Sequence, residues 1–175
     1  PNMAECEVIF TRLHPMPAKG LAHGRAVAGV AVAIAEAVNR HSARSLDIEL
    51  CRAGGWLHDI AKGQRDHERE GERWLRELGF DRAGAIVGAH RDLFWEPSMA
   101  VGEREIVYLA DKLIQESRLV TVCEWFERKR TLHRDDATAI RAIDHWREQT
   151  ELLVAAIGTE AGQPPAEIAK TAMVA

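Results

Sequence analysis

Apolar residues recur at steps of three and four along most of this chain, which is the spacing of one face of an α-helix. The stretch that runs from Val27 through Val30 to Ile34 is typical, and it lies in a sequence rich in alanine, leucine, glutamate and arginine. Alternation of apolar and polar residues, which would indicate β-strands, is rare. The pattern therefore predicts an all-α protein, a compact bundle of about six to eight helices.

Prolines, glycines and capping residues set the expected helix boundaries. The two prolines of the segment 14–20 cannot lie in a helix interior, and Gly79 is a typical residue after a helix C-terminus. Ser45 or Asp47 is a suitable N-cap for the helix that follows. We expect helices at about residues 4–13, 18–40, 47–60, 67–78, 82–90, 103–129 and 134–158, with a short polar tail after them.

Size and charge limit the classes of partner. The chain has 175 residues, which fits one domain with a sizeable core. Its formal net charge is −4, and without a basic run a nucleic-acid partner is not expected. We expect no membrane partner either, since no stretch looks long and apolar enough to span a bilayer and no signal peptide is evident. The widely spaced Cys6, Cys51 and Cys123 are typical of reduced thiols in the cytoplasm.

Four histidines and two aspartates fall on core-facing positions of the expected helices or at their ends. His23 lies one turn before Val27 on the same face, and Asp111 lies one turn after Val107. One inward histidine is usually a hydrogen-bonded core residue, but six such groups need a common partner, and a metal ion is the simplest one. Imidazole and carboxylate together suit iron, manganese or zinc rather than calcium. The full set is His23, His58, Asp59, His67, His90 and Asp111.

The order and local context of these residues resemble a known superfamily. "HDIAKG" contains His58, Asp59 and Lys62 in an HD-x-x-K pattern, and "DHEREG" supplies His67 four residues before a glycine. "IVGAH" ends in the fourth histidine of the set, and "IVYLADKL" carries the last aspartate. With His23 before them, these motifs resemble the HD domain superfamily of metal-dependent phosphohydrolases, over residues 21–118 or so.

The resemblance implies a dinuclear site with a water or hydroxide between the ions. Divalent transition metals are expected, with iron or manganese favoured and zinc, magnesium, nickel or cobalt as alternatives. Neighbouring helical residues point about 100° apart, so His58 and Asp59 can reach one cluster only at a distorted helix end, which Lys62 and Gly63 predict. The implied ligands are His23, His58, Asp59 and Asp111 for the first metal, and His67 and His90 for the second, with Asp59 shared.

The implied reaction is hydrolysis of a phosphate ester or anhydride of a nucleotide or another small molecule, by attack of the bridging hydroxide. Asp59 and Lys62 are then the catalytic residues. Lys62 is also a candidate phosphate contact, although a surface lysine is favoured at a helix C-terminus in any case. Arg91, beside the fourth histidine, and Arg118, expected two turns beyond Asp111 on one helix face, are further candidate substrate contacts.

Other functions stay open at this point. A regulatory nucleotide-binding HD domain is the main alternative, and di-iron oxygenase chemistry, which a minority of the superfamily performs, is another. "ADKLIQESR" has a short likeness to the symmetrical diadenosine-tetraphosphate hydrolases of the superfamily. Phe94 and Trp95 lie in an expected loop and are predicted to shape the substrate pocket.

The expected organisation is a single HD domain over residues 1–175. Its metal-binding core covers about 21–118, and a C-terminal helical extension covers about 134–172. A start at Pro1, with Met3 close behind, is compatible with a domain cut from a larger protein and fused there to another domain. The sequence gives no indication of the oligomeric state.

Overall fold

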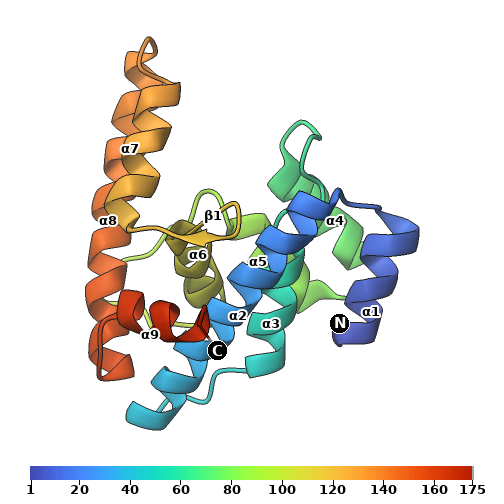
Figure 1. Ribbon diagram of the computed structural model, residues 1–175, viewed down its shortest axis with the longest axis horizontal. Coiled ribbons are helices and arrows are strands. Elements are labelled where there is room, and N and C mark those ends of the chain that lie inside the picture. Colours follow the sequence, from blue (N-terminus) through green and yellow to red (C-terminus); the bar gives the residue numbers. More distant parts are fainter. Residues whose placement is uncertain (175) are drawn as a thin grey trace.

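The computed structural model describes residues 1–174. This part of the chain forms nine α-helices, one π-helical turn and one short hairpin, which confirms the all-α class and adds one helix to the expected range (Figure 1). The elements are α1 (Met3–Val8), the π-helical η1 (Ile9–Leu13), α2 (Ala18–His41), α3 (Ile48–Leu57), α4 (His67–Glu77), α5 (Asp81–Ala89), α6 (Glu103–Leu113), β1 (Ile114–Gln115), β2 (Arg118–Leu119), α7 (Val122–Leu132), α8 (Ala137–Ala161) and α9 (Pro165–Ala172).

Helix α2 runs through the middle of the molecule and packs against α3, α6, α8 and α9 (Figure 1). Its stripe of Val27, Val30 and Ile34 is fully buried, as the periodicity predicts. By length and composition alone α2 could cross a membrane, so the expectation that no such stretch exists is wrong. Most of its apolar window is buried inside the protein, which is the usual state of a core helix.

Two glycines bring α2 and α3 into close contact. A Cβ atom on Gly24 would lie 2.6 Å from the carbonyl oxygen of Trp56, and one on Gly55 would lie 2.7 Å from the Cα of Ala28. Only residues without a side chain permit this approach. It places the N-terminal half of α2, with His23, beside the end of α3.

The helix expected over residues 103–129 is wrong, because α6 ends at Leu113. The chain then forms the antiparallel β1–β2 hairpin, in which Ile114 pairs with Leu119. Helix α7 begins after Thr121, whose hydroxyl accepts a hydrogen bond from the backbone of Glu124 while the Glu124 carboxylate accepts one from the backbone of Thr121. This capping box starts a new helix, and its T-x-x-E signal is present in the sequence.

Two other boundaries differ from the prediction. The expected polar tail contains α9, which begins with Pro165 at its first turn and buries Ile168 and Ala169. A proline is well tolerated there because the first backbone N–H groups of a helix have no partner within the helix. Helix α3 ends at Leu57, one turn earlier than expected, while its N-cap is Asp47, one of the two predicted candidates.

Candidate metal centre and its cavity

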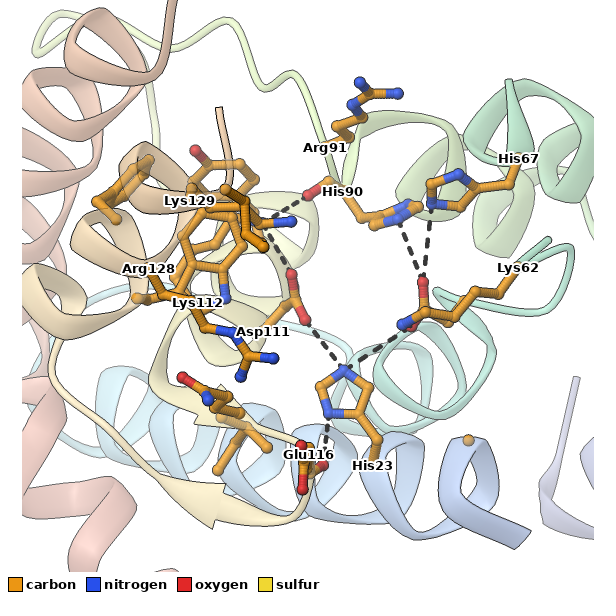
Figure 2. A pocket seen from close by; sticks show the side chains of 18 of the residues that line it. His23, Lys62, His67, His90, Arg91, Asp111, Lys112, Glu116, Arg128 and Lys129 are labelled. Atoms are coloured by element: carbon orange, nitrogen blue, oxygen red, sulfur yellow. Dashed lines mark hydrogen bonds and ion pairs between the residues drawn. The ribbon is translucent and has the colours of Figure 1, made fainter. Parts of the chain in front are cut away.

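The structure brings all six predicted ligands together at one end of a cavity. They come from five helices or the turns that directly follow them, and Figure 2 labels four of them, His23, His67, His90 and Asp111, where they converge. His58 and His90 are the C-cap residues of α3 and α5, and His67 is the first residue of α4. Helix ends deliver most of the set, while His23 and Asp111 lie within α2 and α6.

The donor atoms form two groups. In the first, Nε2 of His23 lies 3.2 Å from Nε2 of His58 and 3.2 Å from Oδ1 of Asp111. The second group contains Asp59, His67 and His90. Within each group the donor atoms lie within 4.8 Å of one another, so each group could hold one metal ion. Imidazole and carboxylate donors of this kind fit a transition metal.

Asp59 faces both groups, and it does so with different oxygens. Its Oδ1 lies 3.7 Å from Nε2 of His67 and 3.8 Å from Nε2 of His90. Its Oδ2 lies 3.6 Å from Nε2 of His58 and 3.9 Å from Nε2 of His23. This is the arrangement of a carboxylate that can bridge two cations.

The distorted helix end that this arrangement needs is present. After Leu57 the chain continues in tight turns, in which the backbone N–H of Lys62 donates to the carbonyl of Asp59 over 2.8 Å. Gly63 closes the segment with φ = +101°, a conformation that favours glycine. The regular helix thus ends at this pair, with His58 as its C-cap, and both His58 and Asp59 reach the cluster.

Three of the four histidines of the set have a hydrogen-bond acceptor at Nδ1, which leaves Nε2 directed at the carboxylates. Such outer partners fix the ring orientation and make Nε2 the ligating atom of a metal site. The acceptors are the carbonyl of Glu116 at 2.7 Å for His23, that of Gly55 at 2.8 Å for His58, and that of Val87 at 2.6 Å for His90. Nδ1 of His67 lies 3.1 Å from a carboxylate oxygen of Glu68, without hydrogen-bond geometry.

Two residues with left-handed backbone lie directly beside the ligands. Glu116, with φ = 59°, turns the β1–β2 hairpin and presents its carbonyl to His23. Asp66, with φ = 50°, is the N-cap of α4 and precedes His67. Non-glycine residues in this conformation carry strain, and such strain is common around functional sites.

Electrostatics keep the two carboxylates and His90 in the state that metal ligands need, while they favour the protonated form of His58. Burial opposes the protonation of His58, but the Asp59 and Asp111 carboxylates outweigh it and raise the His58 pKa. Burial would raise the pKa of Asp59, but His58 and Lys62 lower it to about 2. The pKa of His90 falls to about 4, first through burial and then through His58. The carboxylates are therefore ionised at neutral pH, and His90 is neutral with a free lone pair.

A cavity of about 910 Å³ opens onto the cluster. Lys62 and Arg91 line it, as expected of substrate contacts. Arg118 does not line it, and its expected position on the same helix face as Asp111 is wrong. The break after Leu113 moves Arg118 from the expected helix to the exposed strand β2, away from the face of Asp111.

The aromatic residues of the cavity are also different from those predicted. Trp95 is buried in the core and Phe94 is 68% exposed, and neither lines the cavity. Trp125 on α7 and Trp146 on α8 line it instead. These two residues reach the cavity because α7 and α8 fold back over it after the β1–β2 hairpin. The continuous helix predicted over residues 103–129 has no such reversal.

Lys112 is the main site residue that the sequence reasoning left without a role. The residue is 2% exposed, and its ammonium group lies 4.4 Å from the ring centroid of Tyr108 and 4.6 Å from that of Trp125. It also donates to Asp111 and to the backbone of His90. A lysine next to an aspartate inside the apolar stretch "VYLADKLI" is a signal that could have identified it.

Comparison with known proteins agrees with this geometry. The family model described as HD domain matches residues 20–116, more than half of the chain, so the chain belongs to the HD domain family. An uncharacterized protein of Methanocaldococcus jannaschii is 38% identical over 68 residues, which are 37% of this chain and 40% of that relative. The chain thus matches less than half of the relative's length. No solved structure gives a significant match.

Proposed function

We propose that this chain is a metal-dependent phosphohydrolase that cleaves a phosphate ester or anhydride of a small molecule such as a nucleotide. The observation that carries the proposal is the position of Asp59, whose two oxygens face two separate groups of ligands. Membership in the HD domain family supports metal-dependent hydrolase chemistry. The cavity supports a small substrate with negative charge, because several lysines and arginines line it.

The ligand groups assign the residues that would hold the metals. Asp59 would contact both ions, and its low pKa keeps it available for cations rather than protons. Two divalent ions, when bound, would neutralise phosphoryl oxygens and make a water molecule nucleophilic at neutral pH. Iron or manganese suits the donors best among the candidates. The first ion would take His23, His58 and Asp111, and the second His67 and His90.

Two cations of the chain are placed to bind the phosphoryl group. Lys62 forms an ion pair with Asp59, yet its side chain is 62% exposed, so it can reach a substrate oxygen from the cluster's edge. A guanidinium nitrogen of Arg91 lies 3.1 Å from Oε1 of Glu68. The other carboxylate oxygen of Glu68 lies beside Nδ1 of His67. A lysine acts as a point charge and an arginine as a two-pronged donor to phosphate. Together they would orient the phosphorus toward the ligand cluster.

The test uses protein stripped of metal and then supplied separately with manganese, iron, magnesium or zinc. Release of phosphate from a panel of nucleotides and simple phosphate esters is measured for the parent and for Asp59→Asn. Asp135→Asn is the matched control, because this aspartate is exposed and does not line the cavity. We expect the parent and the control to hydrolyse at least one substrate and Asp59→Asn to lose this activity.

Two other results would contradict the proposal. Tight nucleotide binding without phosphate release under any metal would identify a regulatory domain. Consumption of oxygen by the iron-loaded protein, without phosphate release, would identify an oxygenase. Both measurements use the same metal-loaded samples.

A further inference from the structure

Two cations on α7 face the cavity without an acidic partner. Arg128 and Lys129 both line it. Among the described residues 1–174, no carboxylate lies within 4.0 Å of either side chain, whereas the next residue, Arg130, pairs with Asp144 on α8. Helix α7 also lies outside the segment 20–116 that matches the HD domain. These two charges add to Lys62 and Arg91, which line the same cavity.

Lys129 is held where an anion would be favourable. Its ammonium group lies 4.9 Å from the ring centroid of Trp125, the same ring that contacts Lys112. Burial lowers the pKa of Lys129, Lys112 lowers it further, and Asp111 opposes these effects only in part. Positive charges that crowd one wall of a cavity repel one another, and an anion between them relieves the repulsion.

The position of these cations relative to the ligand cluster indicates a second binding point. In Figure 2, Arg128 and Lys129 lie on one side of Asp111, while Lys62 and His67 lie on the opposite side. A phosphoryl group at the cluster, next to Lys62, leaves the α7 side of the same cavity unoccupied. A substrate that uses both sides must carry two anionic groups.

We propose that Arg128 and Lys129 form an anion-binding subsite for a second phosphate or carboxylate of the substrate. The subsite makes the enzyme select substrates with two anionic groups over simple monoesters. This inference rests on the proposed phosphohydrolase function for its biological meaning, but the subsite can be tested by binding alone.

The test compares three non-hydrolysable probes that share a methylphosphonate scaffold: methylphosphonate, phosphonoacetate and methylenebisphosphonate. Affinities are measured by calorimetry on the metal-loaded protein at a fixed excess of free magnesium. We expect Lys129→Met and Arg128→Met each to weaken binding of at least one two-anion probe about tenfold, which is the usual worth of one charge-assisted hydrogen bond. The affinity for methylphosphonate should stay within about twofold. Whichever of phosphonoacetate and methylenebisphosphonate shows the loss identifies a carboxylate or a phosphate subsite.

The controls separate the subsite from general electrostatics and from loss of structure. Arg130→Met removes the same charge from the next residue of α7, which faces Asp144, and should leave the three affinities unchanged. Lys129→Arg should retain most of the two-anion affinity. Equal losses for all three probes in Lys129→Met, or no loss for any, would overturn the proposal. A selective loss in a protein that hydrolyses no phosphate would support the subsite and contradict only the proposed function.

Discussion

The ammonium group of Lys112 lies 2.8 Å from Oδ2 of Asp111 and 2.9 Å from the carbonyl oxygen of His90. Asp111 belongs to the first ligand group and His90 to the second. One buried lysine therefore connects α6 to the end of α5 and holds a ligand of each group.

Replacing Lys112 should destabilise the metal-free protein strongly. Lys112→Met keeps the volume but removes the lysine cation from the buried Asp111 carboxylate, which keeps only its contacts with His23 and His58. Breaking one partner of a buried pair costs about 3–5 kcal/mol. Urea unfolding of chelator-treated protein measures the change. Lys170→Met, on the exposed part of α9, removes the same charge and should shift the free energy of unfolding by less than about 0.5 kcal/mol. Similar small shifts for both variants would refute the connecting role.

Lys62→Ala should lower turnover while leaving the metal content unchanged. Lys62 contacts Asp59 but has no donor atom among the two ligand groups, and its exposed side chain can reach substrate. Elemental analysis and phosphate release on the same preparation measure the two properties. Arg65→Ala is a suitable control, since Arg65 is exposed in the same turn and does not line the cavity. Loss of metal in Lys62→Ala, or turnover equal to the parent, would show that the assigned role is wrong.

Acid should destabilise the metal-free protein through His90. The pKa of this residue falls from its ordinary 6.5 to about 4, because burial and His58 disfavour its charged form. Between these values the unfolded chain binds the proton that the folded chain rejects, so stability falls as the pH drops from about 6.5 toward 4. The shift corresponds to about 3 kcal/mol.

Urea unfolding of chelator-treated parent and His90→Gln, at several values between pH 7 and pH 4, isolates this contribution. The raised pKa of His58 has the opposite effect on stability, since the stabilisation that it provides is lost as the pH rises. His58 is present in both the parent and the variant, so the comparison isolates His90. The difference in stability between parent and variant should therefore shrink as the pH falls. A difference independent of pH would contradict the assignment.

The α2–α3 contact predicts opposite effects for two glycine substitutions. A Cβ atom on Gly55 would meet the backbone of Ala28 at 2.7 Å, so Gly55→Ala must push the helices apart. We expect the free energy of unfolding to fall by about 1–3 kcal/mol. Metal binding should also weaken, because the separation of α2 from α3 moves His23 away from His58. On α2, a Cβ on Gly29 meets nothing within 4 Å, and Gly29→Ala should stabilise the helix by about 0.5–1 kcal/mol. Thermal and urea unfolding compare the two, and a stable Gly55→Ala would contradict the tight contact.

The convergence of the six predicted ligands could be anticipated from the sequence, because each lies in a short motif that resembles the HD domain family, on a helix or directly at its end. The end of helix α6 at Leu113 could not be predicted from helix-breaking residues, since neither proline nor glycine occurs from Glu103 to Lys129. Tertiary contacts set it instead. The carbonyl of Glu116 in the hairpin turn accepts the hydrogen bond of His23, and the backbone of Val120 donates to the carbonyl of Leu113.

This one missed break explains most of the errors at the site. The predicted continuous helix would have placed Arg118 on the same face as Asp111, and residues 122–129 would have extended away from the cavity. The hairpin reverses the chain, exposes Arg118, and lets α7 present Lys129 to the site. Substrate contacts depend on such reversals between distant segments, whereas ligand motifs depend on local spacing. The capping box at Thr121 was the available signal for the true start of α7.

Metal stoichiometry distinguishes a dinuclear site from a mononuclear one. His67 and His90 belong only to the second group, so His67→Ala and His90→Ala should each leave about one metal per chain in a folded protein. Activity should fall by orders of magnitude, because a nucleophile activated by two ions loses one of them. Asp59→Ala should bind little or no metal, since its carboxylate faces both groups.

Elemental analysis of the three variants beside the parent gives the metal ratios. His145→Ala, an exposed histidine of α8 outside both groups, is the control and should keep the parent ratio. If both His67→Ala and His90→Ala also keep it, these residues are only polar neighbours at helix ends. The centre would then be mononuclear, and it would consist of His23, His58, Asp59 and Asp111.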